Sequence, residues 1–91
     1  MTRDEVYASI DSERTYQEQR WSNSRPKLIS SYILYMEHYM EEARKLCSTT
    51  NETPGTESAM AIMDVLRKVT ALGVACGEEH KMPERNYMEN K

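Results

Sequence analysis

The most informative stretch of this chain is Met60–Arg85, MAIMDVLRKVTALGVACGEEHKMPER, most of which is predicted to form one helix. Its apolar residues recur every three or four positions, the spacing of a helix, and they cover two of its sides. A helix that is apolar on two sides packs against two neighbours. Its middle carries two adjacent cations, Arg67 and Lys68, which require either acids on a neighbouring helix or a bound anion.

Clusters of turn-forming residues at 22–26 and 47–56 divide the rest of the chain. The segments between them lack the alternation of β-strands and carry helical periodicity. We therefore expect one all-α domain, residues 1–91, in which a short first helix packs on a long antiparallel hairpin of two further helices. The predicted elements are helices over about 4–21, 27–46 and 57–77, followed by a tail over 78–91.

Each predicted helix has a face suited to packing. In the first helix this face comprises Tyr7, Ile10, Arg14, Gln17 and Trp21, and it is apolar at both ends and polar in the middle. In the second helix it comprises Ile29, Tyr32, Ile33, Met36, Tyr39, Met40, Ala43 and Leu46, with Tyr35 beside it. In the third helix Gly73 and Gly77 stand four residues apart. Since glycine costs about 1 kcal/mol relative to alanine in a helix, another backbone or a ligand is expected to approach them closely.

The composition predicts a thin core. The 91 residues include 7 Met and 6 Tyr but no Phe, and the mean hydropathy is −0.81. Small chains of this kind commonly gain stability by self-association. We therefore expect a homo-oligomer that forms through the Tyr- and Met-rich face of the second helix or through the face of the third helix that carries Gly73 and Gly77. The net charge of −3 argues against non-specific DNA binding. The lack of a signal peptide or of an apolar run of about 20 residues predicts a protein of the host cell cytoplasm that does not enter membranes.

The position of Arg67 and Lys68 leaves two interpretations open. An antiparallel hairpin that turns near residues 51–55 would bring Glu37 level with them. The pair of cations then either forms an ion pair with Glu37 or holds an anion, and the sequence does not decide between the two.

No catalytic arrangement is present in the sequence. It has neither a G-x-S-x-G turn nor a glycine-rich phosphate loop. The four potential zinc ligands, Cys47, Cys76, His38 and His80, are too far apart along the predicted hairpin to converge. We therefore predict a protein that is not an enzyme and that has no cofactor and no metal.

The hairpin resembles that of MazG-like nucleotide pyrophosphohydrolases, in which acids spaced E-x-x-E and E-x-x-D hold magnesium. Neither motif occurs in this chain. Where the second motif would lie, the sequence has Val65 and Lys68. The resemblance therefore implies a protein that holds phosphates but does not cleave them, because magnesium requires carboxylates.

A second resemblance covers nearly the whole chain. Three blocks occur in order: E-R-x-Y-Q-x-x-x-W at 13–21, R-K-V-x-A-L-G-V-A-C at 67–76 and E-x-H-x-x-P-x-R at 78–85. Together they resemble a family of short, mostly uncharacterised accessory proteins of tailed phages and prophages. The sequence departs from the pattern at Lys81, where glycine commonly follows the histidine.

Two functions are compatible with these features, and a residual MazG-like nucleotide pyrophosphohydrolase is a distant third. The first is a non-enzymatic phage accessory protein that sequesters a phosphate-bearing small molecule, such as a cyclic nucleotide that signals host immunity. The second is an interaction module that inhibits a host enzyme. Cations bind phosphate and aromatic rings stack on bases. The predicted ligand-binding residues are Arg14, Tyr16, Trp21, Arg67, Lys68, His80 and Arg85.

Overall fold

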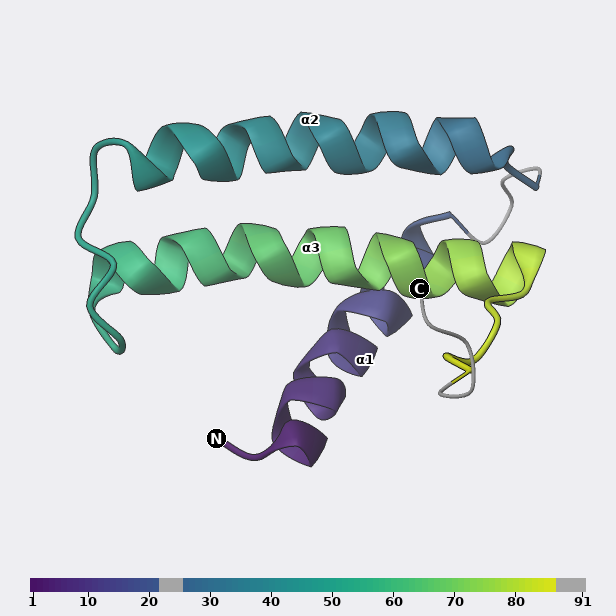
Figure 1. The fold of residues 1–91 in the computed structure, drawn as a ribbon, viewed down its shortest axis with the longest axis horizontal. Coiled ribbons are helices and arrows are strands. Elements are labelled where there is room, and N and C mark those ends of the chain that lie inside the picture. The colour runs from purple at the N-terminus through teal and green to yellow at the C-terminus, as the bar shows by residue number, and fades with distance from the viewer. Residues whose placement is uncertain (22–25, 87–91) are drawn as a thin grey trace.

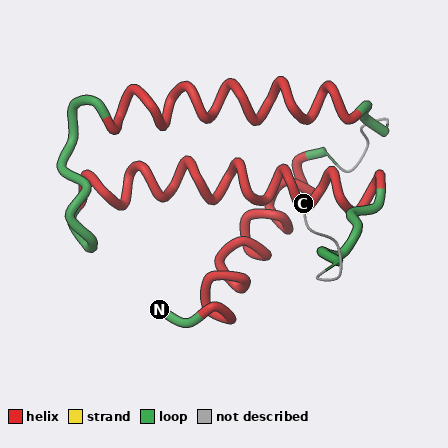
Figure 2. Tube along the Cα trace, in the orientation of Figure 1, coloured by secondary structure: helices red, strands yellow, loops and turns green. Residues whose placement is uncertain are grey.

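The computed structural model describes residues 1–21 and 26–86. This part of the chain contains three helices and no strand (Figures 1 and 2). The helices are α1 (Arg3–Arg20), α2 (Ile29–Cys47) and α3 (Glu57–His80). The predicted all-helical architecture is confirmed. The predicted turn over 22–26 lies outside the described residues except for Pro26.

Local sequence signals fix the beginnings of two of the helices. Thr2 and Glu5 form a capping box at the start of α1, in which each side chain accepts a hydrogen bond from the other residue's backbone N–H. These hydrogen bonds lower the pKa of the Glu5 carboxyl group. The hydroxyl of Thr56 caps α3 by accepting from the N–H of Ala59. The third helix runs to His80, three residues beyond its predicted end, and stops where Lys81 adopts a φ of 67°.

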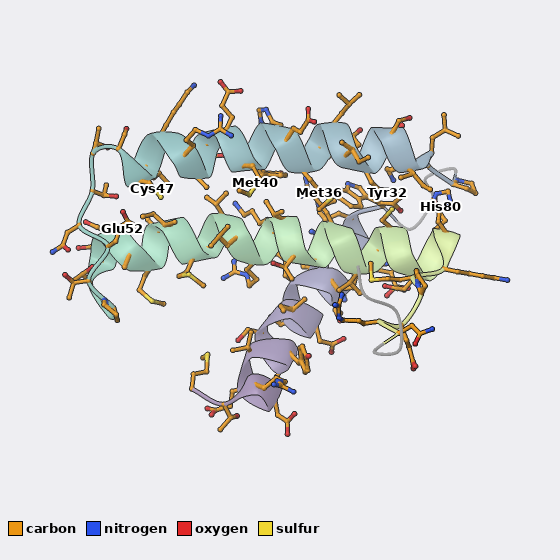
Figure 3. The ribbon with its side chains drawn as sticks, in the orientation of Figure 1. Tyr32, Met36, Met40, Cys47, Glu52 and His80 are labelled. Carbon is orange, nitrogen blue, oxygen red and sulfur yellow. The ribbon has the colours of Figure 1, made fainter. Side chains whose placement is uncertain are left out.

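The central helix is α3. It lies side by side with α2, which runs in the opposite direction, and α1 packs against another side of it (Figure 1). The buried centre comprises Tyr32, Leu72 and Ala75. Figure 3 shows Tyr32 and Met36 between α2 and α3. The residues packed around this centre are Trp21, Met36, Tyr39 and Cys76.

The chain's own methionines occupy the space beside the two helical glycines. A Cβ at Gly73 would lie 3.8 Å from the terminal methyl of Met36. A Cβ at Gly77 would lie 3.2 Å from that of Met82, because the chain beyond Lys81 turns back onto α3. The expectation that another backbone or a ligand approaches these glycines is therefore wrong, because side chains of the same chain lie beside them.

Polar residues dominate the contact of α1 with α3. The two buried residues of α1 are Glu13, 8% exposed, and Gln17, 5% exposed. The prediction that Tyr7 belongs to the packed face is wrong, because its side chain is exposed. With little apolar surface to bury, α1 depends on hydrogen bonds and ion pairs to stay on α3.

Part of the predicted apolar stripe of α2 remains uncovered. Its residues Ile29, Ile33 and Met40 recur at spacings of four and seven, so they share one side of the helix, and all three are exposed. On α3, Met63 and Val74 are exposed as well. Across residues 1–21 and 26–86, none of the helices is apolar over enough of its length to cross a membrane.

Candidate functional site

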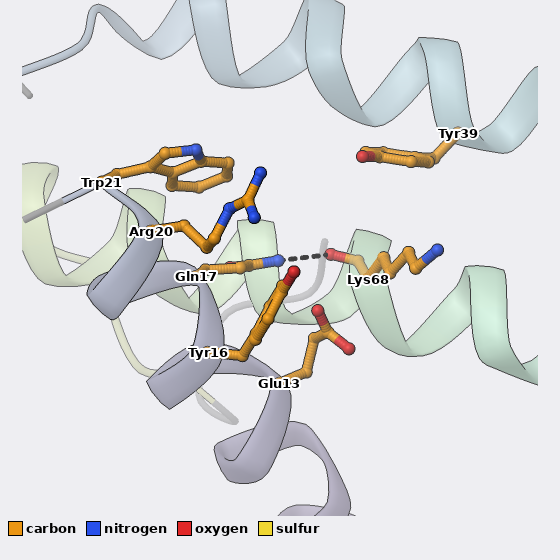
Figure 4. A pocket seen from close by; sticks show the side chains of 7 residues that line it. All are labelled: Glu13, Tyr16, Gln17, Arg20, Trp21, Tyr39 and Lys68. Carbon is orange, nitrogen blue, oxygen red and sulfur yellow. Dashed lines mark hydrogen bonds between the residues drawn. The ribbon is translucent and has the colours of Figure 1, made fainter.

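A cavity of about 280 Å³ opens where the end of α1 meets α2 and α3 (Figure 4). All three helices contribute to it, so it exists only when α1 is packed on α3. Its lining combines charged, aromatic and amide side chains: Glu13, Tyr16, Gln17, Arg20, Trp21, Tyr39 and Lys68.

Arg67 lies beside this cavity but does not line it. Its Nε donates to the Glu13 carboxylate over 2.8 Å, and its terminal nitrogen donates to Asp64 on the preceding turn of α3. These carboxylates raise the pKa of Arg67, the hydrogen bond to Glu13 being the largest cause. The pairing expected with Glu37 is wrong, since the acids that pair with Arg67 come from α1 and from α3 itself.

The register of the α2–α3 pair explains this outcome. Met36 packs on Gly73, and the ammonium of Lys68 lies 5.8 Å from the centre of the Tyr39 ring. Lys68 is therefore level with Tyr39, whereas the sequence argument placed it opposite Glu37. Glu37 is exposed and belongs to a different side of α2 from the tyrosine.

Two cations remain available at the cavity. Lys68 has a long contact of 3.7 Å with the exposed carboxylate of Asp64. The guanidinium of Arg20 lies 5.8 Å from the ring centre of Tyr16 and forms no ion pair with the residues that the structure describes. Of the charged residues that line the cavity, two are cations, Arg20 and Lys68, and one is a carboxylate, Glu13, which is paired with Arg67. The local field therefore favours an anionic guest.

The three aromatic rings play different roles. Tyr16 is exposed and Tyr39 is half-buried, so both rings present area to the cavity. Trp21 is already engaged: its ring stacks on Tyr35, with centroids 6.5 Å apart, and the ammonium of Lys27 lies 4.8 Å from its centre. Tyr16 and Tyr39 also have neighbours: the Arg20 guanidinium lies 5.8 Å from the Tyr16 ring centre, and the rings of His38 and Tyr39 have centroids 5.4 Å apart. Of the three rings, that of Tyr16 is the exposed one, so it offers the most area on which a planar group can stack.

Gln17 contributes the deepest polar group of the lining. Its Nε2 donates to the backbone carbonyl oxygen of Lys68 over 3.2 Å (Figure 4). Its Oε1 is buried and accepts no hydrogen bond from the described residues. Buried acceptors are satisfied in the great majority of cases, so this atom is an exception among the described residues.

The other residues predicted to bind a ligand lie elsewhere. Arg14 binds Glu78 of α3, with Nε 2.6 Å from the carboxylate. It therefore serves to attach α1. Arg85 belongs to the segment after α3 and is exposed. Of the seven predicted residues, the structure brings three to the cavity: Tyr16, Trp21 and Lys68.

His80 belongs to a separate polar cluster that ties the start of α2 to the end of α3. Its Nε2 lies 2.6 Å from the carbonyl oxygen of Lys27 and 3.1 Å from the carboxylate of Glu79. Because both partners are acceptors, Nε2 carries the hydrogen. Glu79 also accepts from the Tyr32 hydroxyl. Burial, and next the charge of Glu79, raise the pKa of Tyr32.

No group of three or more His, Cys, Asp or Glu side chains within residues 1–21 and 26–86 is arranged to hold a metal ion. Cys47 and Cys76 are both free thiols. Of the residues that line the cavity, only Glu13 carries a carboxylate, and it is paired with Arg67. The arrangement is suited to holding a molecule.

Sequence reasoning missed Glu13, Gln17 and Arg20 as site residues. Gln17 could have been identified from the sequence, because its amide side chain lies on the face of α1 that also carries Ile10 and Trp21. A polar side chain on a packed face is informative because burial requires it to have partners. No family model, curated protein or solved structure matches the chain, so the interpretation of this site depends on its geometry and chemistry.

Proposed function

We propose that this protein is a non-enzymatic phage accessory protein that binds and sequesters a phosphate-bearing small molecule, a nucleotide or cyclic nucleotide of host immunity. The observation that carries the proposal is the cavity at the end of α1. It combines the cations Arg20 and Lys68 with the rings of Tyr16 and Tyr39. The connection to phages comes from the three sequence blocks at 13–21, 67–76 and 78–85.

Each part of a nucleotide has a complementary group in this cavity. Phosphate oxygens accept charge-assisted hydrogen bonds from guanidinium and ammonium groups. A planar base stacks on tyrosine, and such stacking tolerates different bases. The volume of about 280 Å³ is at the small end of the range for small-molecule sites. It therefore suits one nucleotide unit, and a larger nucleotide would extend beyond the rim.

Calorimetric titration of mono-, di- and cyclic nucleotides tests the proposal. We expect binding by the wild type and a loss of affinity of about tenfold or more in Lys68→Met and in Arg20→Met, because each removes a charge-assisted hydrogen bond to phosphate. Lys45→Met is the matched control: this lysine is exposed on α2 and contacts only Glu41 among the ion pairs of the described residues. Absence of heat with every nucleotide would contradict the proposal.

The surface of α2 supports the proposal that the chain forms a homo-oligomer. The uncovered apolar side with Ile29, Ile33 and Met40 of α2 supplies suitable surface. The same side serves the second candidate function, inhibition of a host protein, if the chain proves to be a monomer.

A further inference from the structure

The uncovered apolar side of α2 lies away from the end of α1. That end approaches α2 at Tyr35, whose ring stacks on Trp21 with centroids 6.5 Å apart. Ile33 and Met40, which are 48% and 40% exposed, lie about 140–160° around the helix from Tyr35, since each residue turns the helix by about 100°. This side of α2 is therefore open to another chain.

Two opposite charges, those of Glu37 and Arg44, border this apolar side. They are seven residues apart, so they lie on the same side of α2 about two turns from each other, next to Ile33 and Met40. Both side chains are exposed, and neither forms an ion pair with the residues that the structure describes. A partner that carries the opposite order of charges would pair both of them.

A second copy of the chain carries that order when its α2 runs antiparallel. A twofold axis that crosses α2 between Met40 and Glu41 places Glu37 of each copy opposite Arg44 of the other. Two identical ion pairs then flank the Met40 side chains, which meet at the axis. A parallel arrangement would place like charges opposite each other, which is unfavourable.

We propose that the chain forms a twofold dimer through this side of α2, in which the two α2 helices run antiparallel and Glu37 of each copy pairs with Arg44 of the other. A contact of this symmetry must be complementary to itself, and the order of the two charges meets that condition. This inference rests on the homo-oligomer of the proposed function, and it names the surface and the orientation of the contact.

Charge reversal tests the pairing. Glu37→Arg and Arg44→Glu each replace two attractive contacts by two like-charge contacts, because the axis repeats every change. We expect each variant to raise the dimer dissociation constant about tenfold or more in analytical ultracentrifugation at low salt, where exposed charges are least screened. The double variant, and an equimolar mixture of the two single variants, should return the constant to about the wild-type value. Glu41→Arg and Lys45→Glu make the same charge changes on another side of α2 and should leave the constant nearly unchanged.

Disulfide cross-linking tests the direction of the helices without changing a charge. The proposed contact brings Ile33 level with Cys47 of the other copy, whereas the two Cys47 thiols lie roughly 20 Å apart along the helices. Ile33→Cys should therefore give a covalent dimer on mild oxidation, and the additional change Cys47→Ser should abolish it. The wild type and Leu34→Cys, a change on another exposed side of α2, should give none. If the charge variants do not fold, as judged by circular dichroism, cross-linking decides the question alone.

The outcomes separate this contact from the proposal on which it rests. A wild type that stays a monomer overturns the homo-oligomer, and this inference fails with it. An oligomer that neither charge reversal weakens overturns the antiparallel contact and leaves the homo-oligomer in place. A wild-type dimer linked through its two Cys47 residues overturns the antiparallel contact as well.

Discussion

Arg67 and Lys68 are adjacent cations with side chains of equal exposure, 36%, and the structure assigns them different roles. Arg67 contacts the Glu13 carboxylate, which is 9% exposed, over 2.8 Å. Lys68 contacts Asp64, which is 47% exposed, over 3.7 Å. Replacement of each by Met removes one charge at the same exposure, so the two variants differ mainly in the partner that is left behind.

Arg67→Met leaves the buried carboxylate of Glu13 without the hydrogen bond that the Arg67 guanidinium donates to it. A hydrogen bond between charged groups contributes about 1.5–3 kcal/mol, so we expect the free energy of unfolding to fall by about 2 kcal/mol. In a domain of this size that corresponds to a decrease in Tm of about 8–16 °C. Lys68→Met removes an exposed ion pair and should change stability by about 0.5 kcal/mol or less.

Thermal and urea unfolding followed by circular dichroism, at one protein concentration, measures both effects. The double variant Glu13→Gln with Arg67→Met should lose less than the sum of the single losses, with a coupling energy of about 1–2 kcal/mol. A loss in Lys68→Met equal to or larger than that in Arg67→Met would refute the assignment of Arg67 to the attachment of α1.

Three further outcomes are expected. Gly73→Ala should stabilise the protein by about 0.5–1 kcal/mol, because alanine favours the helix and its Cβ would lie at an ordinary contact distance from Met36. Gly77→Ala should stabilise the protein less, because its Cβ would lie too near Met82; thermal melts measure both changes. Burial raises the pKa of Tyr32 above its ordinary value of 10.0, so the contribution of Tyr32 to stability should be constant below pH 10 and fall as pH rises through the raised pKa; urea unfolding should show a smaller alkaline loss in Tyr32→Phe. Light scattering should report an oligomer that Ile33→Glu reduces to the 10.6 kDa protomer, and a wild-type monomer would contradict this.

The sequence predicted the helices well because their signals are local. The periodic apolar residues depend only on neighbours within a turn or two. The structure adds caps that are local as well, the hydroxyls of Thr2 and Thr56. The end of α3 was missed by three residues, because its continuation past Gly77 depends on how the chain beyond Lys81 packs back onto it.

The site could be predicted only in part. Tyr16, Trp21 and Lys68 were identified from their chemistry, but the partner of Arg67 could not be, because it depends on a tertiary register. If α2 is shifted along α3 by about one helical turn, another residue of α2 takes the place of Glu37 beside Arg67 and Lys68. Sequence periodicity does not fix such a displacement, whereas the packing of Met36 on Gly73 does.

Native mass spectrometry of protein purified from cells shows whether the protein holds a phosphate-bearing small molecule, because it reports the bound molecule and the number of subunits together. We expect an oligomer whose mass exceeds that of its chains by phosphate-bearing small molecules. We also expect this extra mass to be lost from Lys68→Met while the oligomer persists. A wild-type protein that carries no added mass, even after incubation with the nucleotide panel, would show that the cavity does not bind such a molecule.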